Sequence, residues 1–265
     1  VETLKRQHLM GRLEAARAMH NPKNWEEQKE ARRRTAFEEL FFMQAGILLL
    51  RKKREKQVLS IKCAPSGKLV QAVRDHFPFR LTEGQRQAFS DIEDDMEGLV
   101  PMQRLIQGDV GSGKTAVAAL ALAKIVENGY QGALMAPTEV LAGQHYHTFQ
   151  EFYRGLPIHV AYLSGQTKTK DRNEILQGLL DGSIDVLIGT HALIEKDVVF
   201  AHLGLVITDE QHRFGVRQRK ALETKGGCPH TLVMTATPIP RTMALSIYGD
   251  LDVSSEGYSI SWAVK

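Results

Sequence analysis

One stretch of the chain has the pattern of a loop that binds phosphate groups. Residues 108–115 read GDVGSGKT and fit the pattern G-x-x-x-x-G-K-[ST] in full. Its glycines let backbone N–H groups wrap around phosphates, and the start of the following helix adds partial positive charge. The residues expected to contact a nucleotide are Gly108, Gly111, Ser112, Gly113, Lys114 and Thr115. In this pattern the lysine reaches the β- and γ-phosphates and the threonine offers its hydroxyl to Mg²⁺.

Two adjacent acids, Asp209 and Glu210, can complete this chemistry. They follow the apolar run Leu205–Thr208, which predicts a buried strand. Metal binding and water activation are separate tasks, so we assign Asp209 to magnesium and Glu210 to the attacking water. The alternative, a capping aspartate beside an incidental glutamate, does not explain why the P-loop pattern (108–115) is also present.

The elements that must position these residues follow an alternating pattern. Strands are expected at Arg104–Gln107, Ala133–Ala136, His159–Leu163, Asp185–Gly189, Leu205–Thr208 and Thr231–Thr235. Helical spacings lie between them, for example over Lys114–Glu127 and Glu139–Tyr153. This alternation predicts an α/β fold with a parallel, doubly wound sheet, in which ligands bind at the carboxyl ends of the strands. Both motifs fall at such ends.

The first part of the chain is helical and basic. Residues 1–57 contain few helix breakers, and we expect two helices with a turn near Asn21 and Pro22. Residues 1–80 hold 18 Lys or Arg against 9 Asp or Glu, whereas residues 81–265 hold 16 against 22. A basic arm on a mildly acidic body suits contact with a polyanion. A solvated helix face explains the charge equally well.

Composition excludes several classes of protein. The two cysteines, Cys63 and Cys228, form neither a disulfide framework nor a zinc pattern. His145 and His147 do not suggest a metal site, because residues two apart point to different faces of a helix. We find no apolar run long enough to span a bilayer and no signal peptide, so we expect a cytoplasmic protein.

The order of the motifs resembles that of the superfamily 2 helicases. These have a P-loop, an Asp-Glu-x-His box, here at 209–212, and a Thr-Ala-Thr motif, here at 235–237. Over residues 78–252 the stretches GDVGSGKT, MAPTEVLAGQH, GTHALI, DEQHRFGV and MTATPIPRT are similar to the RecG family of bacterial branch-migrating DNA helicases. Transcription-repair coupling factors share the P-loop and TATPIPRT, but the pair Gln211 and His212 favours RecG.

The resemblance implies a RecA-like domain with ATP and Mg²⁺ as cofactors. It implies that the upstream stretch 79–85, FRLTEGQ, recognises adenine, with Phe79 or Arg80 packing on the base and Gln85 bonding its edge. A helix start capped by Thr82 is the structural alternative, and the two can coexist. His212 is implied as a catalytic partner, and Thr235 and Thr237 as residues that couple hydrolysis to domain movement.

The resemblance also implies contacts with branched or single-stranded DNA. The segments that match the family's groove for nucleic acid are expected to touch phosphate and sugar. The residues concerned are Pro137, Thr138, Glu139, Gln144, Thr190, His191 and Arg241. Thr138 and Thr190 are expected to cap helices as well. Gly143 stands where the family usually has glutamate, which we expect to loosen that helix by about 1 kcal/mol.

We therefore expect a basic helical segment with a linker (1–77), a first RecA-like domain (78–252) and an atypical tail (253–265). The resemblance implies ATP-dependent remodelling of branched DNA in recombination and repair, in the bacterial cytoplasm. The family's second RecA-like domain and wedge domain are not recognised, so we expect part of a larger protein, feebly active or inactive alone. A coupling-factor-like translocase and a nucleotide-binding module without useful hydrolysis remain alternatives.

Overall fold

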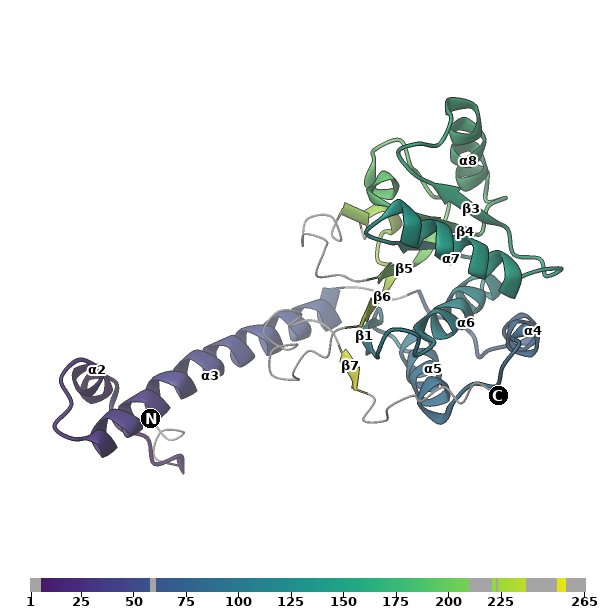
Figure 1. The fold of residues 1–265 in the computed structure, drawn as a ribbon. Helices are drawn as coiled ribbons and strands as arrows, with labels where there is room; N and C mark the ends of the chain where they lie inside the picture. Colours follow the sequence, from purple (N-terminus) through teal and green to yellow (C-terminus); the bar gives the residue numbers. More distant parts are fainter. Residues whose placement is uncertain (1–5, 58–60, 210–220, 223, 237–251, 256–265) are drawn as a thin grey trace. The chain divides into compact units, whose positions relative to one another are not determined.

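The computed structural model describes residues 6–57, 61–209, 221–222, 224–236 and 252–255 (Figure 1). Contacts divide the chain into two compact units. One holds residues 1–56 with 242–250, and the other holds residues 57–241 with 251–265. We call them the helical unit and the motor unit and describe each by itself. Among the described residues, no helix is long and apolar enough to cross a membrane.

Within its described residues, the helical unit contains the helices α2 (Arg12–His20) and α3 (Trp25–Gln57). Helix α2 ends at Asn21, whose backbone N–H donates to the carbonyl of Arg17. Acidic residues in the first turn of α3 suit the positive end of its helix dipole. The small contact between the helices is made by Ala15, Ala18 and Ala31, with Met10 packed against them. The predicted pair of helices with a turn near Asn21 is confirmed.

In the part of the motor unit that the structure describes, seven parallel strands form a sheet in the order β3-β4-β2-β5-β6-β1-β7. Their bounds are β1 Gln103–Gln107, β2 Gln131–Met135, β3 Val160–Leu163, β4 Val186–Gly189, β5 Leu203–Asp209, β6 His230–Thr235 and β7 Asp252–Ser255. The six predicted strands are all present, with ends shifted by one or two residues. Strand β7 was not predicted. It pairs with β1 and crosses the predicted boundary between motor domain and tail.

Helices cover both faces of the sheet, so the doubly wound α/β fold is confirmed (Figure 1). Successive side chains of a strand point to opposite faces. In β5, Leu205 and Ile207 pack into one apolar cluster and Val206 into the other. The first cluster holds side chains of α4 (Lys68–His76), α5 (Glu83–Met96), α6 (Lys114–Glu127) and α7 (Glu139–Phe152). The second holds those of α8 (Thr169–Asp181).

Helix α6, which follows the P-loop, is buried on all sides. Every residue from Ala116 to Ile125 is buried, Lys124 included. Its alanines let the neighbouring elements approach closely, and a helix that is apolar all round belongs in a core. The Lys124 ammonium donates to Glu97 Oε1 at 2.7 Å and to the carbonyl of Ala64 at 3.1 Å. Lys124 thus joins the carboxyl-terminal part of α6 to Ala64 and Glu97.

The segment before residue 78 packs into this same core. Buried side chains of the cluster around α6 include Cys63, Val70, Val73 and Phe77. A hydrogen bond also joins this segment to the sheet, because His230 Nε2 of β6 lies 2.7 Å from the carbonyl oxygen of Ile61. The compact unit thus begins before residue 78, where we placed the domain boundary from the sequence.

Candidate nucleotide site and nucleic-acid interface

The predicted motifs lie in a row along the carboxyl edge of the sheet. In the strand order β4-β2-β5-β6-β1, Thr190 follows β4 and Pro137 comes just after β2. Asp209 ends β5, Thr235 ends β6, and the P-loop starts directly after β1. Because all these strands are parallel, segments far apart in the chain meet at one edge.

The P-loop has the backbone that phosphate binding needs. Gly111 has φ 79° and Gly113 has φ 85°, a region that residues with a Cβ adopt at a cost of roughly 1–2 kcal/mol. A Cβ at Gly108 would lie 2.7 Å from Ser112 Oγ, so a larger residue here would have to displace the Ser112 side chain. Gly113 is the N-cap of α6, which begins at Lys114. The loop therefore leads directly into a helix N-terminus, as the motif predicts.

Two polar side chains of the loop, Lys114 and Ser112, could form new hydrogen bonds to a bound nucleotide. The Lys114 ammonium donates to the carbonyl oxygens of Gly108 at 2.6 Å and Asp109 at 2.9 Å. Ser112 Oγ is buried and has no hydrogen-bond partner. A buried hydroxyl without a partner costs about 1–3 kcal/mol. A phosphate oxygen bound in the loop would accept hydrogen bonds from both groups.

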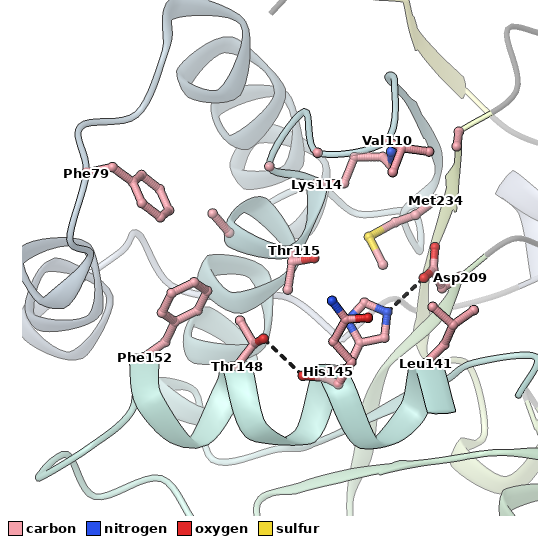
Figure 2. Close-up of a pocket in the computed structure, with 15 residues that line it drawn as sticks. Phe79, Val110, Lys114, Thr115, Leu141, His145, Thr148, Phe152, Asp209 and Met234 are labelled. Carbon is pink, nitrogen blue, oxygen red and sulfur yellow. Dashed lines mark hydrogen bonds and ion pairs between the residues drawn. The ribbon is translucent and has the colours of Figure 1, made fainter. Parts of the chain in front are cut away.

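A cavity of about 490 Å³ lies against the P-loop (Figure 2). One wall is formed by Val110, Gly111, Gly113, Lys114, Thr115 and Ala116, and the facing wall by Leu141, Gln144, His145, Thr148 and Phe152 of α7. Asp209 and Met234 line it from the sheet. The P-loop, with its hydrogen-bond donors for phosphate, helix α7 and the Asp209 carboxylate of β5 thus face the same cavity.

The side chains of Thr115 and Asp209 fit a magnesium ion. Both line the cavity, and both supply the oxygen ligands that Mg²⁺ prefers. Among the residues that the structure describes, no group of three or more His, Cys, Asp or Glu could hold a metal ion.

Phe79, which the resemblance implies packs on the base of the nucleotide, lies at the cavity. It lines the cavity and stacks on Phe77 with ring centroids 5.3 Å apart. Phe152, which the sequence did not single out, meets it edge to face at 6.2 Å. Phe79 and Phe152 form an aromatic end of the cavity that can pack against a flat base, and Phe77 contacts both of these rings.

Gln85 takes part in three hydrogen bonds. Its Oε1 accepts from the backbone N–H of Thr82 at 2.9 Å, and Thr82 Oγ1 accepts from the N–H of Gln85 at 3.3 Å. The expected helix cap at Thr82 is therefore confirmed, as a reciprocal capping box. Gln85 Nε2 donates to the carbonyl of Ser112 at 2.8 Å. The adenine role of Gln85 remains a prediction, and Gln85 also braces the P-loop.

The site contains one contact that sequence reasoning missed. His145 Nε2 lies 2.7 Å from Asp209 Oδ2 (Figure 2). Both residues are 9% exposed. The sequence held a signal, because Leu141, His145 and Phe149 are spaced four apart and share a helix face. That spacing places His145 on the buried side of α7 and His147 outside it.

The segments predicted to contact DNA are close neighbours. Strands β2 and β4 are paired, and the N–H of Ala136 donates to the carbonyl of Gly189 at 2.9 Å. Thr138 and His191 are exposed just beyond these strand ends, and Pro137 and Glu139 are half-buried. Two strand ends thus present adjacent backbone and polar groups to solvent.

Thr138, Thr190 and Gln144, all predicted to contact DNA, differ in their surroundings. Thr138 caps α7, with Oγ1 accepting from the N–H of Leu141 at 3.3 Å, as expected. The expectation for Thr190 was wrong, because its side chain makes no capping bond. The Thr190 hydroxyl is buried and without a partner. Gln144 is exposed and lines the nucleotide cavity.

A family model for DEAD/DEAH box helicases matches residues 82–245. The chain belongs to this helicase family. Among curated proteins it is 51% identical to the ATP-dependent DNA helicase RecG of Thermotoga maritima, over 95% of this chain and 32% of the relative. It is 48% identical to that of Bacillus subtilis, over 91% of this chain and 35% of the relative. The chain therefore spans about a third of the length of these relatives.

Solved helicase structures agree with this result. A structure of RecG bound to a three-way DNA junction superposes with a TM-score of 0.82 at 49% identity, over 94% of this chain and 34% of that chain. The helicase MrfA, bound to DNA and AMPPNP, is 17% identical with a TM-score of 0.58 and shows the fold alone. The resemblance to RecG and the RecA-like helicase fold predicted from the motifs are confirmed.

Some predicted helicase residues lie outside the described part of the chain. These are Glu210, His212, Thr237 and Arg241. Thr235, the predicted coupling residue that is described, ends β6 and is buried. Its backbone carbonyl accepts from the N–H of Gly108, with N and O 3.2 Å apart. The strand that carries the coupling motif is thus bonded to the first residue of the P-loop.

Proposed function

We propose that the chain is the ATP-binding motor domain of a RecG-like DNA helicase, which hydrolyses ATP to move and remodel branched DNA. The observation that carries the proposal is that the P-loop and Asp209 line one cavity, although they come from β1 and β5. The names of the relatives, ATP-dependent DNA helicases, support the same activity.

Each described residue of the site has a role in this proposal. Lys114 would exchange the carbonyls of Gly108 and Asp109 for the β- and γ-phosphates. Thr115 and Asp209 would hold magnesium, which when bound neutralises charge on the phosphates. Phe79 would pack on the base, and Gln85 would read its edge while bracing Ser112.

Residues beyond Asp209 complete the reaction. We assign Glu210 to the attacking water and His212 to the link with the Thr235–Thr237 motif. A DNA strand would follow the exposed segments after β2 and β4, through Pro137, Thr138, Glu139 and His191, where the relative's junction complex supports contact with branched DNA. Gln144, Thr190 and Arg241 are weaker members of this surface.

The proposed activity requires more than this domain. Translocation needs two domains that alternately grip DNA, so a second RecA-like domain would supply arginine fingers worth about 10³–10⁵-fold in rate. A wedge domain would split the junction. We place this work in the bacterial cytoplasm, on DNA undergoing recombination and repair.

An ATPase assay with and without forked DNA tests the proposal on the full-length protein that carries this chain. We expect turnover stimulated by the fork and dependent on Mg²⁺. In the Glu210→Gln variant, ATP should still bind, but single-turnover hydrolysis should slow by about 10²–10⁴-fold. Nucleotide binding without any turnover in the wild type would instead favour a nucleotide-binding module.

A further inference from the structure

We propose that His145 is a positioning residue of the ATPase site, which fixes the Asp209 carboxylate for magnesium. The inference rests on the proposed function. It assigns a role to a side chain of α7 that none of the motifs of the nucleotide site includes. The contact joins residues 64 positions apart, from a helix and from the end of a strand.

The geometry shows how the carboxylate is oriented. A carboxylate accepts hydrogen bonds and cannot donate one, so His145 Nε2 carries the hydrogen in the 2.7 Å contact with Asp209 Oδ2. With Oδ2 held, rotation of the carboxylate is restricted, and Oδ1 stays available to a ligand in the cavity that both residues line. Hydrogen bonds of this kind orient the groups that bind a metal directly.

The imidazole ring is itself held by packing. His145 lies between Ala142 and Phe149, which are fully buried, and its ring meets that of Phe149 edge to face at 6.4 Å. Helix α7 is also fixed at its start by the Thr138 cap. Asp209 is the last residue of β5, which is paired on both sides, with β2 and with β6. Both partners therefore have little freedom to separate.

Figure 2 shows that Thr115, His145 and Asp209 point into the same space. Thr115 comes from the P-loop helix, so the two expected protein ligands of magnesium belong to α6 and β5. His145 adds a third element, α7, to the site. Loss of the His145 hydrogen bond would leave the Asp209 carboxylate free to rotate. The affinity for magnesium would then fall, while the P-loop would be unchanged.

Magnesium-dependent nucleotide binding tests this role without requiring turnover. The probe is a fluorescent, non-hydrolysable ATP analogue, titrated with Mg²⁺ and in excess EDTA. His145→Leu keeps apolar packing but lacks a donor, whereas His145→Gln carries an amide N–H at a similar reach. His147→Ala is the matched control, because His147 is exposed on the same helix.

We expect His145→Leu to raise the Mg²⁺ concentration for half-maximal binding by about 10–100-fold, with binding in EDTA unchanged. His145→Gln should recover most of this loss, and His147→Ala should match the wild type. Equal Mg²⁺ dependence in the Leu variant and the wild type, or a lower requirement in the variant, would overturn the inference alone. A wild-type protein that binds nucleotide without any Mg²⁺ dependence would overturn the proposed function as well.

Discussion

At the scale of single residues, Lys114 separates nucleotide binding from folding. Its ammonium contacts loop carbonyls, while the rest of α6 is held by buried apolar side chains. We expect Lys114→Ala to lose most affinity for ATP-Mg²⁺ with little change in melting temperature, because the proposed role of its charge is to bind phosphates and the core does not depend on it. Calorimetric titration of both proteins, with thermal melts as the control, checks this. Equal affinities would remove the P-loop assignment.

His230 makes the stability of the motor unit depend on pH. Burial lowers the pKa of His230 to about 4, although a bond to the carbonyl of Ile61 opposes this shift. The folded protein therefore keeps the imidazole neutral, whereas the unfolded chain takes up a proton as the pH falls below about 6.5. Stability is full above that pH and is lost as the pH falls toward 4.

We expect His230 to lower the free energy of unfolding by about 2 kcal/mol between pH 7.5 and pH 5. Urea titrations at these two pH values measure the change. The His230→Gln variant, which does not titrate here, should lose this part of the pH dependence. The same pH dependence in both proteins would show that another group is responsible.

The sequence predicted the positions of those site residues that belong to a contiguous motif. Gly108–Thr115 and Asp209 were placed correctly at strand ends, because each motif includes the turn that positions it. The role of His145 could not be predicted in the same way. It depends on how α7 lies against β5, which no local pattern encodes. From the sequence, His145 was considered only as a weak candidate for contact with DNA and as part of a rejected metal pair with His147.

At the scale of elements, two glycines differ in what they contribute to their helices. Gly143 lies inside α7 with nothing within 4 Å of a Cβ built on it. Gly182 is the C-cap of α8 with φ 80°. We expect Gly143→Ala to stabilise the motor unit by about 0.5–1 kcal/mol, because alanine is the better helix former.

Gly182→Ala is the matched control and should destabilise the unit by about 1 kcal/mol, because alanine is strained at positive φ. Urea unfolding of the two variants beside the wild type gives both values. A destabilised Gly143→Ala variant would mean that α7 needs flexibility at this position, and would undermine our expectation that glycine merely loosens it.

Strands and helices of the motor unit were predictable where apolar periodicity was strong. The six predicted strands and α6 fall within one or two residues of their predicted bounds. Strand β7 was missed because Asp252–Ser255 has only one apolar residue, Val253, and its pairing with β1 supplies the strand. The Thr190 cap failed for a similar reason. Local preference favours a capping threonine, but tertiary packing buried the hydroxyl.

At the scale of the whole molecule, the position of the domain boundary matters for stability. We counted residues 1–80 as one basic region, but charge does not report packing. Val70, Val73 and Phe77 lie in the core around α6. Burying such side chains contributes roughly 1.5–3 kcal/mol each, against a total stability of about 5–15 kcal/mol for a domain.

We expect a shortened chain that begins at Gln57 to keep the melting temperature of the motor unit and its affinity for ATP. A chain that begins at residue 78 should fold poorly or not at all, because it lacks these three side chains. Thermal melts and nucleotide titrations of the two shortened proteins compare them. A stable, nucleotide-binding chain from residue 78 would support the boundary drawn from the sequence.

Strand β7 brings Ser255 to the carboxyl edge of the sheet, beside the start of the P-loop. Ser255 pairs with Gln107, the residue directly before the P-loop, and the two strands are parallel. A peptide or fluorophore fused after Ser255 is thereby tethered beside the nucleotide cavity. Over a linker of a few residues, its effective concentration there is in the millimolar range. A group attached at this sheet edge would therefore contact a bound nucleotide within the same molecule, so that even a weak interaction between the two could be detected.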